Sequence, residues 1–252
     1  MSNKNTIFIN FCSGKSGVGK SVLSSNFAYL LSEQGNKVLL LDGDCLQSMQ
    51  NFIFGIKPKY GIKELLDQKI DLKNATHQIN ENLSILTYNS LTSINIVYHN
   101  KVEYLIELIR NSNLYDFVII DTASELNEDL INSIKLSDIV MLIINEDPIS
   151  LIDSYALLKV IKLYQKPQNI KLLINNIIDE EDANSLEHKL NSVNSKFLNL
   201  KIKKIGYIPY DRQLRTSILN QNIYVKSNNH SELAVALKKI ALKIEELFFV
   251  VK

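Results

Sequence analysis

Short, continuously hydrophobic runs alternate along the chain with longer segments whose apolar residues recur at helical spacing. A strand that is buried on both faces has no polar side, so such runs are typical of a parallel sheet covered by helices. The pattern predicts strands at 6–12, 37–42, 83–88, 117–121, 139–145, 170–175 and 204–208, and helices at 20–34, 101–112, 150–164, 180–195 and about 230–249. We therefore expect a three-layer α/β/α fold with a mostly parallel, twisted sheet and helices on both faces.

No feature of the sequence marks a boundary between domains. The chain has 8 Gly and 4 Pro among 252 residues, with no low-complexity stretch and no internal repeat. We expect residues 1–252 to form a single domain that ends in the helix at about 230–249. Asn229 and Glu232 have the spacing of a capping box for that helix.

The amino-acid composition excludes several classes of protein. Lys plus Arg number 28 and Asp plus Glu 27, so the net charge of +1 gives no overall basic surplus for nucleic acid. The two cysteines, Cys12 and Cys45, make neither a disulfide framework nor a four-thiolate metal site. No run reaches the roughly 18 apolar residues that cross a bilayer. We expect a cytoplasmic protein.

The most informative motif is G-x-x-x-x-G-K-S, which runs from Gly14 to Ser21 between the first predicted strand and the first predicted helix. Its glycines let successive N–H groups turn toward a phosphate, and the following helix adds its positive end. Lys20 can reach the β- and γ-phosphates, and the Ser21 hydroxyl can ligate Mg²⁺. The alternative is a strand–helix turn without a ligand. We predict that a nucleotide's phosphates are bound by Gly14, Lys15, Ser16, Gly17, Val18, Gly19, Lys20, Ser21 and Val22.

The lysine directly after Gly14 makes the motif more specific. Residues 15–21, KSGVGKS, resemble the loop K-G-G-V-G-K-[ST] of the deviant Walker A ATPases, the MinD/ParA superfamily of P-loop NTPases, with Ser16 in place of a glycine. In that family the first lysine reaches across a homodimer with ATP sandwiched between the subunits. The resemblance implies this catalytic role for Lys15, with ATP and Mg²⁺ as cofactors. A cation delivered in trans stabilises phosphoryl-transfer charge only in the closed dimer, which couples hydrolysis to dimerisation.

Two further segments resemble the switches of this family. Residues 42–55, DGDCLQSMQNFIFG, resemble the first switch of MinD and FlhG, roughly D-A-D-L-G-L-A-N-L-D-x-L-L-G. The resemblance implies that Asp42 lies at the Mg²⁺ site and that Asp44 orients the attacking water or lies next to Mg²⁺; oxygen ligands suit this hard cation. The alternative is a pair of aspartates that cap a turn. Leu46 and Met49 replace the family's glycine and asparagine.

The second switch segment is Asp121-Thr122-Ala123-Ser124-Glu125, which follows a predicted strand and resembles D-T-[GP]-[AP]-G. An aspartate at this place is the Walker B residue, so Asp121 is expected to hold Mg²⁺ through water. Ala123 and Glu125 stand where the family has more permissive residues, which restricts the backbone motion on which a switch depends.

The resemblance also implies a base-binding region. Asn175 stands at a strand end where the family's asparagine reads adenine with one donor and one acceptor, although a turn asparagine is the alternative. Residues 206–211, GYIPYD, match the family's G-x-[IV]-P-x-D, whose backbone lines the base pocket. The expected adenine-binding residues are therefore Asn175, Pro209, Tyr210 and Asp211.

A further segment indicates which branch of the MinD/ParA superfamily the chain resembles. Residues 146–159, EDPISLIDSYALLK, resemble the FlhG pattern P-E-P-T-S-x-x-D-A-Y-x-x-[IL]-K. The MinD/FlhG branch implies an ATP-dependent dimeric switch that regulates the placement or number of a cell structure, either flagella or the division site. It also implies a flagellar or division regulator as protein partner, and peripheral contact with the cell membrane as a further expectation.

Other functions stay open at this point. A ParA-type DNA-partitioning ATPase would bind DNA as a dimer, through a cluster such as Lys201, Lys203, Lys204, Arg212 and Arg215. A nucleotide-binding regulator with weak or no hydrolysis is favoured by Leu46, Met49 and Ala123. The last helix, with Phe248 and Phe249 near its end, is either a membrane anchor or the final core helix, and we favour the core helix.

Overall fold

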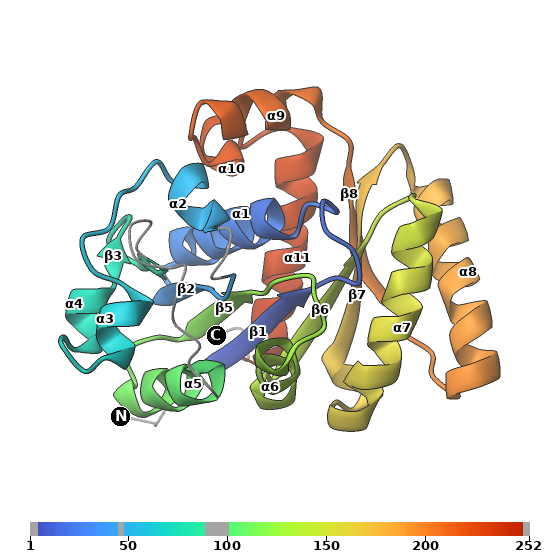
Figure 1. The fold of residues 1–252 in the computed structure, drawn as a ribbon. Helices are drawn as coiled ribbons and strands as arrows, with labels where there is room; N and C mark the ends of the chain where they lie inside the picture. The colour runs from blue at the N-terminus through green and yellow to red at the C-terminus, as the bar shows by residue number, and fades with distance from the viewer. Residues whose placement is uncertain (1–4, 45–47, 89–100, 249–252) are drawn as a thin grey trace.

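The computed structural model describes residues 5–44, 48–88 and 101–248 (Figure 1). Cys45 and Leu46, and the predicted helix end at Phe249, lie outside these ranges. Within them a single eight-stranded sheet has the order β3-β4-β2-β5-β1-β6-β7-β8, and β3 pairs antiparallel with β4 while the other pairs are parallel. The strands are β1 (Ile7–Cys12), β2 (Val38–Asp42), β3 (His77–Gln78), β4 (Leu83–Leu86), β5 (Phe117–Asp121), β6 (Ile139–Ile144), β7 (Ile170–Ile177) and β8 (Lys204–Pro209).

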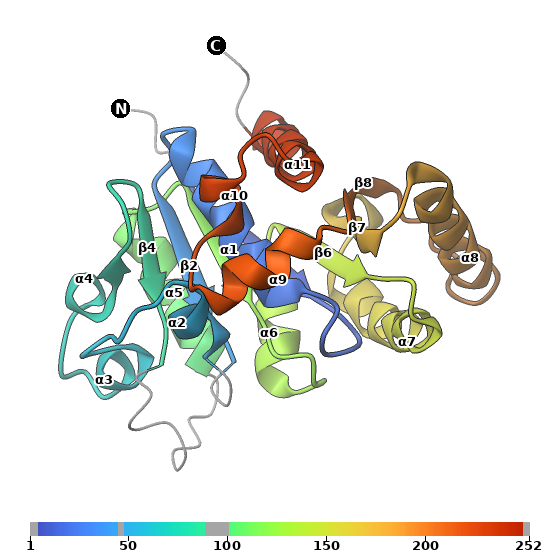
Figure 2. The same ribbon diagram turned by 90° about the horizontal axis from the view of Figure 1, so that it is seen from above.

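Helices cover both faces of the sheet, so the predicted three-layer α/β/α fold is confirmed (Figures 1 and 2). One face carries α1, α10 and α11, and the other carries α5, α6, α7 and α8. The helices are α1 (Lys20–Glu33), α2 (Met49–Ile53), α3 (Ile62–Leu66), α4 (Leu72–Ala75), α5 (Lys101–Ser112), α6 (Glu128–Leu136), α7 (Pro148–Tyr164), α8 (Glu180–Leu198), α9 (Arg212–Leu219), α10 (Tyr224–Ser227) and α11 (Glu232–Phe248), with the 3₁₀ turn η1 (Pro167–Asn169).

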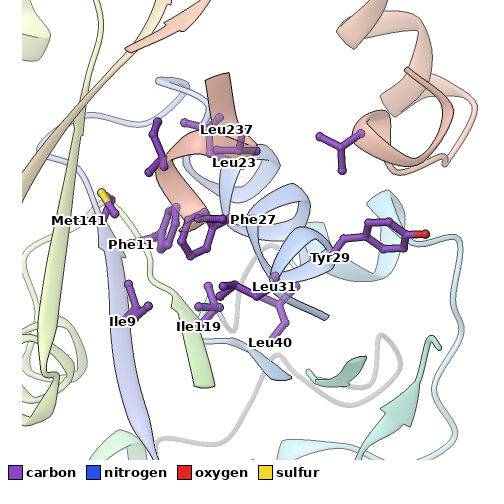
Figure 3. Close-up of a cluster of buried hydrophobic side chains, with 14 of the residues drawn as sticks. Ile9, Phe11, Leu23, Phe27, Tyr29, Leu31, Leu40, Ile119, Met141 and Leu237 are labelled. Atoms are coloured by element: carbon purple, nitrogen blue, oxygen red, sulfur yellow. The ribbon is translucent and has the colours of Figure 1, made fainter. Parts of the chain in front are cut away.

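Alternate residues of each central strand enter two separate cores. In β1, Ile9 and Phe11 face α1 and α11, whereas Phe8 faces α5 on the other side. Phe11 meets Phe27 of α1 in a tilted ring contact with centroids 5.4 Å apart, and Figure 3 shows this pair at the centre of the α1 core. Burial on both faces explains why these strands are continuously hydrophobic in sequence.

The last helix, α11, packs as a core helix. Leu237, Ile240 and Ile244 are buried on the α1 side of the sheet, and Phe248 packs against the same cluster. The predicted capping box of Asn229 and Glu232 is wrong, because the helix begins two residues later than that box requires. The Ser231 hydroxyl accepts from the backbone N–H of Ala234 at 3.1 Å and caps the first turn instead.

The strand order places one sheet edge where a ligand is expected. β1 lies between β5 and β6, so chain connections diverge to opposite sides of its carboxyl end. In open α/β sheets this is the topological switch point at which ligands bind. The G-x-x-x-x-G-K-S loop joins β1 to α1 at that point.

The Phe11–Phe27 contact gives a direct test of the α1 core. Phe27→Ala removes a fully buried ring and is expected to lower the free energy of unfolding by about 3–5 kcal/mol, because it loses burial and leaves a cavity. Denaturant unfolding measures the difference. Phe197→Ala is the matched control, since that side chain is 63% exposed and its loss should change stability by less than about 0.5 kcal/mol. Equal losses in the two variants would contradict this packing.

Candidate nucleotide-binding site

The loop between β1 and α1 has a backbone shape that its glycines make possible. Gly19 has φ of 94°, and a Cβ at this position would lie 2.2 Å from the Asn175 amide nitrogen. A Cβ at Gly14 would lie 2.3 Å from the carbonyl carbon of Asp153 in α7. Any side chain at these two positions would therefore collide with β7 or α7. Ser16 and Gly17, at the tip of the loop, are exposed to solvent.

Two buried carboxylates lie next to each other below this loop. Asp42 and Asp121 end the neighbouring strands β2 and β5 and are partners in register. The Lys20 ammonium, only 9% exposed, lies 3.5 Å from one oxygen of Asp121. Burial raises the pKa of Asp42 well above its usual range, and the charge of Asp121 raises it further. One lysine cannot balance the charge of both carboxylates when both are ionised, and this oxygen-rich set fits Mg²⁺.

The first switch segment surrounds this carboxylate pair. The backbone N–H of Asp44 donates to Asp42 at 3.2 Å, so the predicted Mg²⁺ residue and the predicted water-orienting residue are adjacent. Gln50, at the start of α2, donates from its side chain to Asp121 at 2.8 Å and to the Ser21 carbonyl at 3.1 Å. Sequence analysis missed Gln50, because the spacing from Asp42 carries no motif for it. Ser21 and Val22 lie in the first turn of α1.

Lys15 points to a different partner from Lys20. Its ammonium forms an ion pair with Asp147, the residue that caps the amino end of α7, and both side chains are about one-third exposed. The hydrogen bond from Lys15 lowers the pKa of Asp147, and the N–H of Ile149 adds to this effect. Sequence analysis missed Asp147 as well. The sequence indicates a helix cap at Asp147, directly before Pro148. Its contact with Lys15 could not be predicted, because the two residues are 132 positions apart.

The second switch segment is tied to the end of β1. The Thr122 hydroxyl donates to the Phe11 carbonyl at 2.8 Å, and the Ser124 and Ser13 hydroxyls are 3.4 Å apart. The N–H of Gly43 donates to the Asp121 carbonyl at 2.8 Å, which joins this segment to the first switch. Ala123 is half-buried and Glu125 is exposed.

The residues expected around the base lie on neighbouring strand ends. The Asn175 amide donates to the Val18 carbonyl at 2.7 Å, so this side chain supports the loop from the side of β7. Pro209 ends β8, and the next residue, Tyr210, is 62% exposed. Both carboxylate oxygens of Asp211 accept hydrogen bonds, from the N–H of Gln213 and from the Tyr224 hydroxyl, and burial together with Asp211 raises the pKa of Tyr224 to about 12.

The basic residues considered for DNA binding do not form one cluster. Lys201, Lys203 and Lys204 line a cavity of about 740 Å³ beside the start of β8. Arg212 and Arg215 belong to α9, which follows the opposite end of that strand. The structure therefore divides this group between the two ends of β8.

Among the described helices, none combines the length and the apolar character needed to cross a bilayer.

Comparisons with known proteins agree with this fold. The family model AAA_31, an AAA domain, matches residues 6–174. Antiactivator FleN of Pseudomonas aeruginosa is 26% identical over 235 residues, covering 92% of this chain and 84% of FleN. Flagellum site-determining protein YlxH of Helicobacter pylori is 26% identical over 242 residues, covering 94% of this chain and 81% of YlxH. Septum site-determining protein MinD of Pyrococcus horikoshii, solved with Mg-ADP, has a TM-score of 0.81 at 22% identity and covers 97% of this chain and 98% of its own.

The fold and the phosphate loop define the class of protein as a P-loop NTPase with a mostly parallel sheet. More particularly, the chain belongs to the AAA_31 family, and its predicted place in the MinD/FlhG branch of the MinD/ParA superfamily is confirmed.

The raised pKa of Asp42 gives a pH-dependent prediction. The folded chain keeps this proton to higher pH than the unfolded chain, so the free energy of unfolding should fall as pH rises from the ordinary aspartate pKa through the folded one. Asp42→Asn removes the buried like charge and should flatten this dependence. At neutral pH it should stabilise the nucleotide-free protein by about 1–2 kcal/mol, or roughly 2–8 °C.

Thermal unfolding at several pH values, without nucleotide, measures both effects. Asp44→Asn is the control, because Asp44 is a carboxyl of the same segment but is half-buried, whereas Asp42 is fully buried. A pH profile of Asp42→Asn with the slope of the wild type would contradict the strained carboxylate pair.

Proposed function

We propose that the chain binds Mg-ATP at the phosphate loop and dimerises around it, as an ATPase switch similar to MinD and FlhG. The observation that carries the proposal is the different placement of two lysines on one loop. Lys20 lies inside, 3.5 Å from Asp121, whereas Lys15 lies at the rim and pairs with Asp147. A cation at the rim can leave an exposed partner and reach the phosphates of a second subunit, which supports a sandwich dimer.

The proposed roles of the remaining residues follow from their positions. The N–H groups of residues 14–22, with Lys20, bind the phosphates. Ser21, Asp42 and Asp121 hold Mg²⁺, which when bound neutralises phosphate charge. Asp44 orients the attacking water from its place beside Asp42. Asn175, Pro209, Tyr210 and Asp211 border the adenine, with backbone groups in the larger part because the Asp211 carboxylate is already bonded.

Exposed apolar side chains on the elements around the loop support self-association. Met49 and Phe52 of α2 are 37% and 42% exposed, and Ile149 and Ile152 of α7 are 55% and 67% exposed. Both helices contact the site: α2 through Gln50, and α7 through the Asp147 cap that pairs with Lys15. Exposed apolar side chains on elements that border a ligand site are typical of an interaction surface. A second subunit that packed on α2 and on the amino end of α7 would bring the two loops together.

The relatives suggest the process that the switch serves. FleN is named an antiactivator, and YlxH is named a flagellum site-determining protein. We propose that this chain likewise controls the number or placement of flagella or of the division site, through an ATP-bound dimer that binds a flagellar or division regulator. ATP hydrolysis then dissolves the dimer. The proposed location is the cytoplasm, with peripheral contact to the membrane in the ATP state.

Dimerisation that depends on the nucleotide and on Lys15 tests the proposal. In size-exclusion chromatography with light scattering, the wild type should be monomeric with Mg-ADP and dimeric with a non-hydrolysable ATP analogue and Mg²⁺. Lys15→Ala should bind the analogue yet stay monomeric, because the trans cation is lost. Lys196→Ala, an exposed lysine beside Phe197 on α8, is the control and should dimerise normally. A wild type that binds the analogue but stays monomeric would refute the dimer.

The ion pair between Lys15 and Asp147 predicts a change in the strength of dimerisation. Asp147→Asn keeps the cap on the Ile149 N–H but removes the charge that holds Lys15 within its own subunit. Because the pair is partly exposed, a modest, severalfold tightening of the analogue-bound dimer is expected. Analytical ultracentrifugation measures the dissociation constant. Unchanged or weaker dimerisation would show that the pair does not compete with the trans contact.

A further inference from the structure

Gln50 is a fully buried polar side chain that links three parts of the site. Its amide nitrogen lies 2.8 Å from Asp121, 3.1 Å from the Ser21 carbonyl and 3.2 Å from the Ser24 hydroxyl. Its own backbone N–H donates to Asp42 at 3.3 Å. One residue of α2 therefore provides a neutral donor to each of the two buried carboxylates and fastens them to the first turn of α1.

The surrounding groups fix the orientation of the Gln50 amide. The atom facing Asp121 and the Ser21 carbonyl must be the nitrogen, because an oxygen there would meet two acceptors. Ser24 donates its own proton to the Ser21 carbonyl at 3.0 Å, so its oxygen is left to accept from Gln50. The Gln50 carbonyl oxygen is consequently turned the other way. It is buried and finds no hydrogen-bond partner among the described residues.

A buried amide oxygen without a partner costs free energy unless a ligand or a water satisfies it. Here the amide belongs to a residue that already holds both carboxylates of the candidate Mg²⁺ site. The switch pattern given above has leucine at this position, and a leucine has no donor or acceptor. The amide is therefore a feature of this chain's site that the family pattern does not supply.

We propose that Gln50 is a positioning residue for Mg²⁺, which rests on the proposed function. Its NH₂ group holds the Asp121 carboxylate in place when Lys20 turns to the phosphates, and its backbone N–H holds the Asp42 carboxylate, so that both keep the positions in which they would face the ion. The polar groups around metal ligands orient those ligands and tune affinity for the ion.

The experiment measures the Mg²⁺ dependence of ADP binding rather than activity. Fluorescent N-methylanthraniloyl-ADP is titrated into each protein, first in EDTA and then at increasing Mg²⁺. Gln50→Met keeps the length of the side chain, and Gln50→Leu introduces the residue of the family pattern. Either variant removes both the donor and the acceptor, and either suffices if the other fails to fold. The Mg²⁺ concentration for half-maximal enhancement of binding should rise about tenfold or more, while ADP affinity in EDTA changes little.

Asn51→Leu is the matched control, because Asn51 is the neighbouring amide of the same helix and also has a buried oxygen without a hydrogen-bond partner among the described residues. Its NH₂ group donates to the Tyr88 carbonyl at 2.9 Å rather than to a carboxylate, so its Mg²⁺ midpoint should match that of the wild type. A Gln50 variant with the wild-type midpoint, or an equal shift in Asn51→Leu, would overturn the inference. Failure of the wild type to bind ADP with Mg²⁺ would instead refute the proposed function.

Discussion

Two carboxylates of like charge, buried side by side at the ends of adjacent parallel strands, are the constraint on which the site depends. The register of β2 and β5 places Asp42 and Asp121 together, and the hydrophobic strands behind them exclude water. Such a pair needs positive charge or donors, because in a medium of low dielectric constant both groups cannot ionise without compensation. The chain supplies one ammonium, from Lys20, and several neutral donors. A cation bound beside Asp42 and Asp121 would therefore stabilise the folded protein.

The phosphate loop is held by contacts at both sides, and these contacts connect it to the rest of the molecule. Gly14 packs against the backbone of α7, and Asn175 holds the Val18 carbonyl from β7. The rim lysine, Lys15, pairs with the cap of the same helix α7. A subunit that approached α7 would therefore act directly on the loop. A physical link between a surface helix and a phosphate loop is what a nucleotide-dependent switch requires.

Much of the fold was predictable because burial on both faces leaves an unambiguous mark in the sequence. The continuous apolar runs of β1, β5 and β6 became central strands, and the long helices α1, α5, α7, α8 and α11 followed from their helical spacing. The short helices α2, α3, α4 and α10 span one turn or little more, so they show no periodicity and were missed. The two-turn helices α6 and α9 were missed as well. The start of α11 was misplaced by two residues, because Asn229 and Ser231 are equally good caps in sequence and only packing selects one.

The sequence by itself determined the glycine-rich loop between β1 and α1, the strand-end positions of Asp42 and Asp121 and the class of protein, because glycine conformation and strand-end position are local properties of short segments. Only the tertiary structure decided what these groups touch. Asp147 meets Lys15 across 132 positions, and Gln50 meets Asp121 across 71. Contacts of this kind arise from the strand order and register of the whole sheet, which no local pattern encodes. The charge balance of the site is therefore a property of the fold, whereas the types of functional group in it could be read from the sequence.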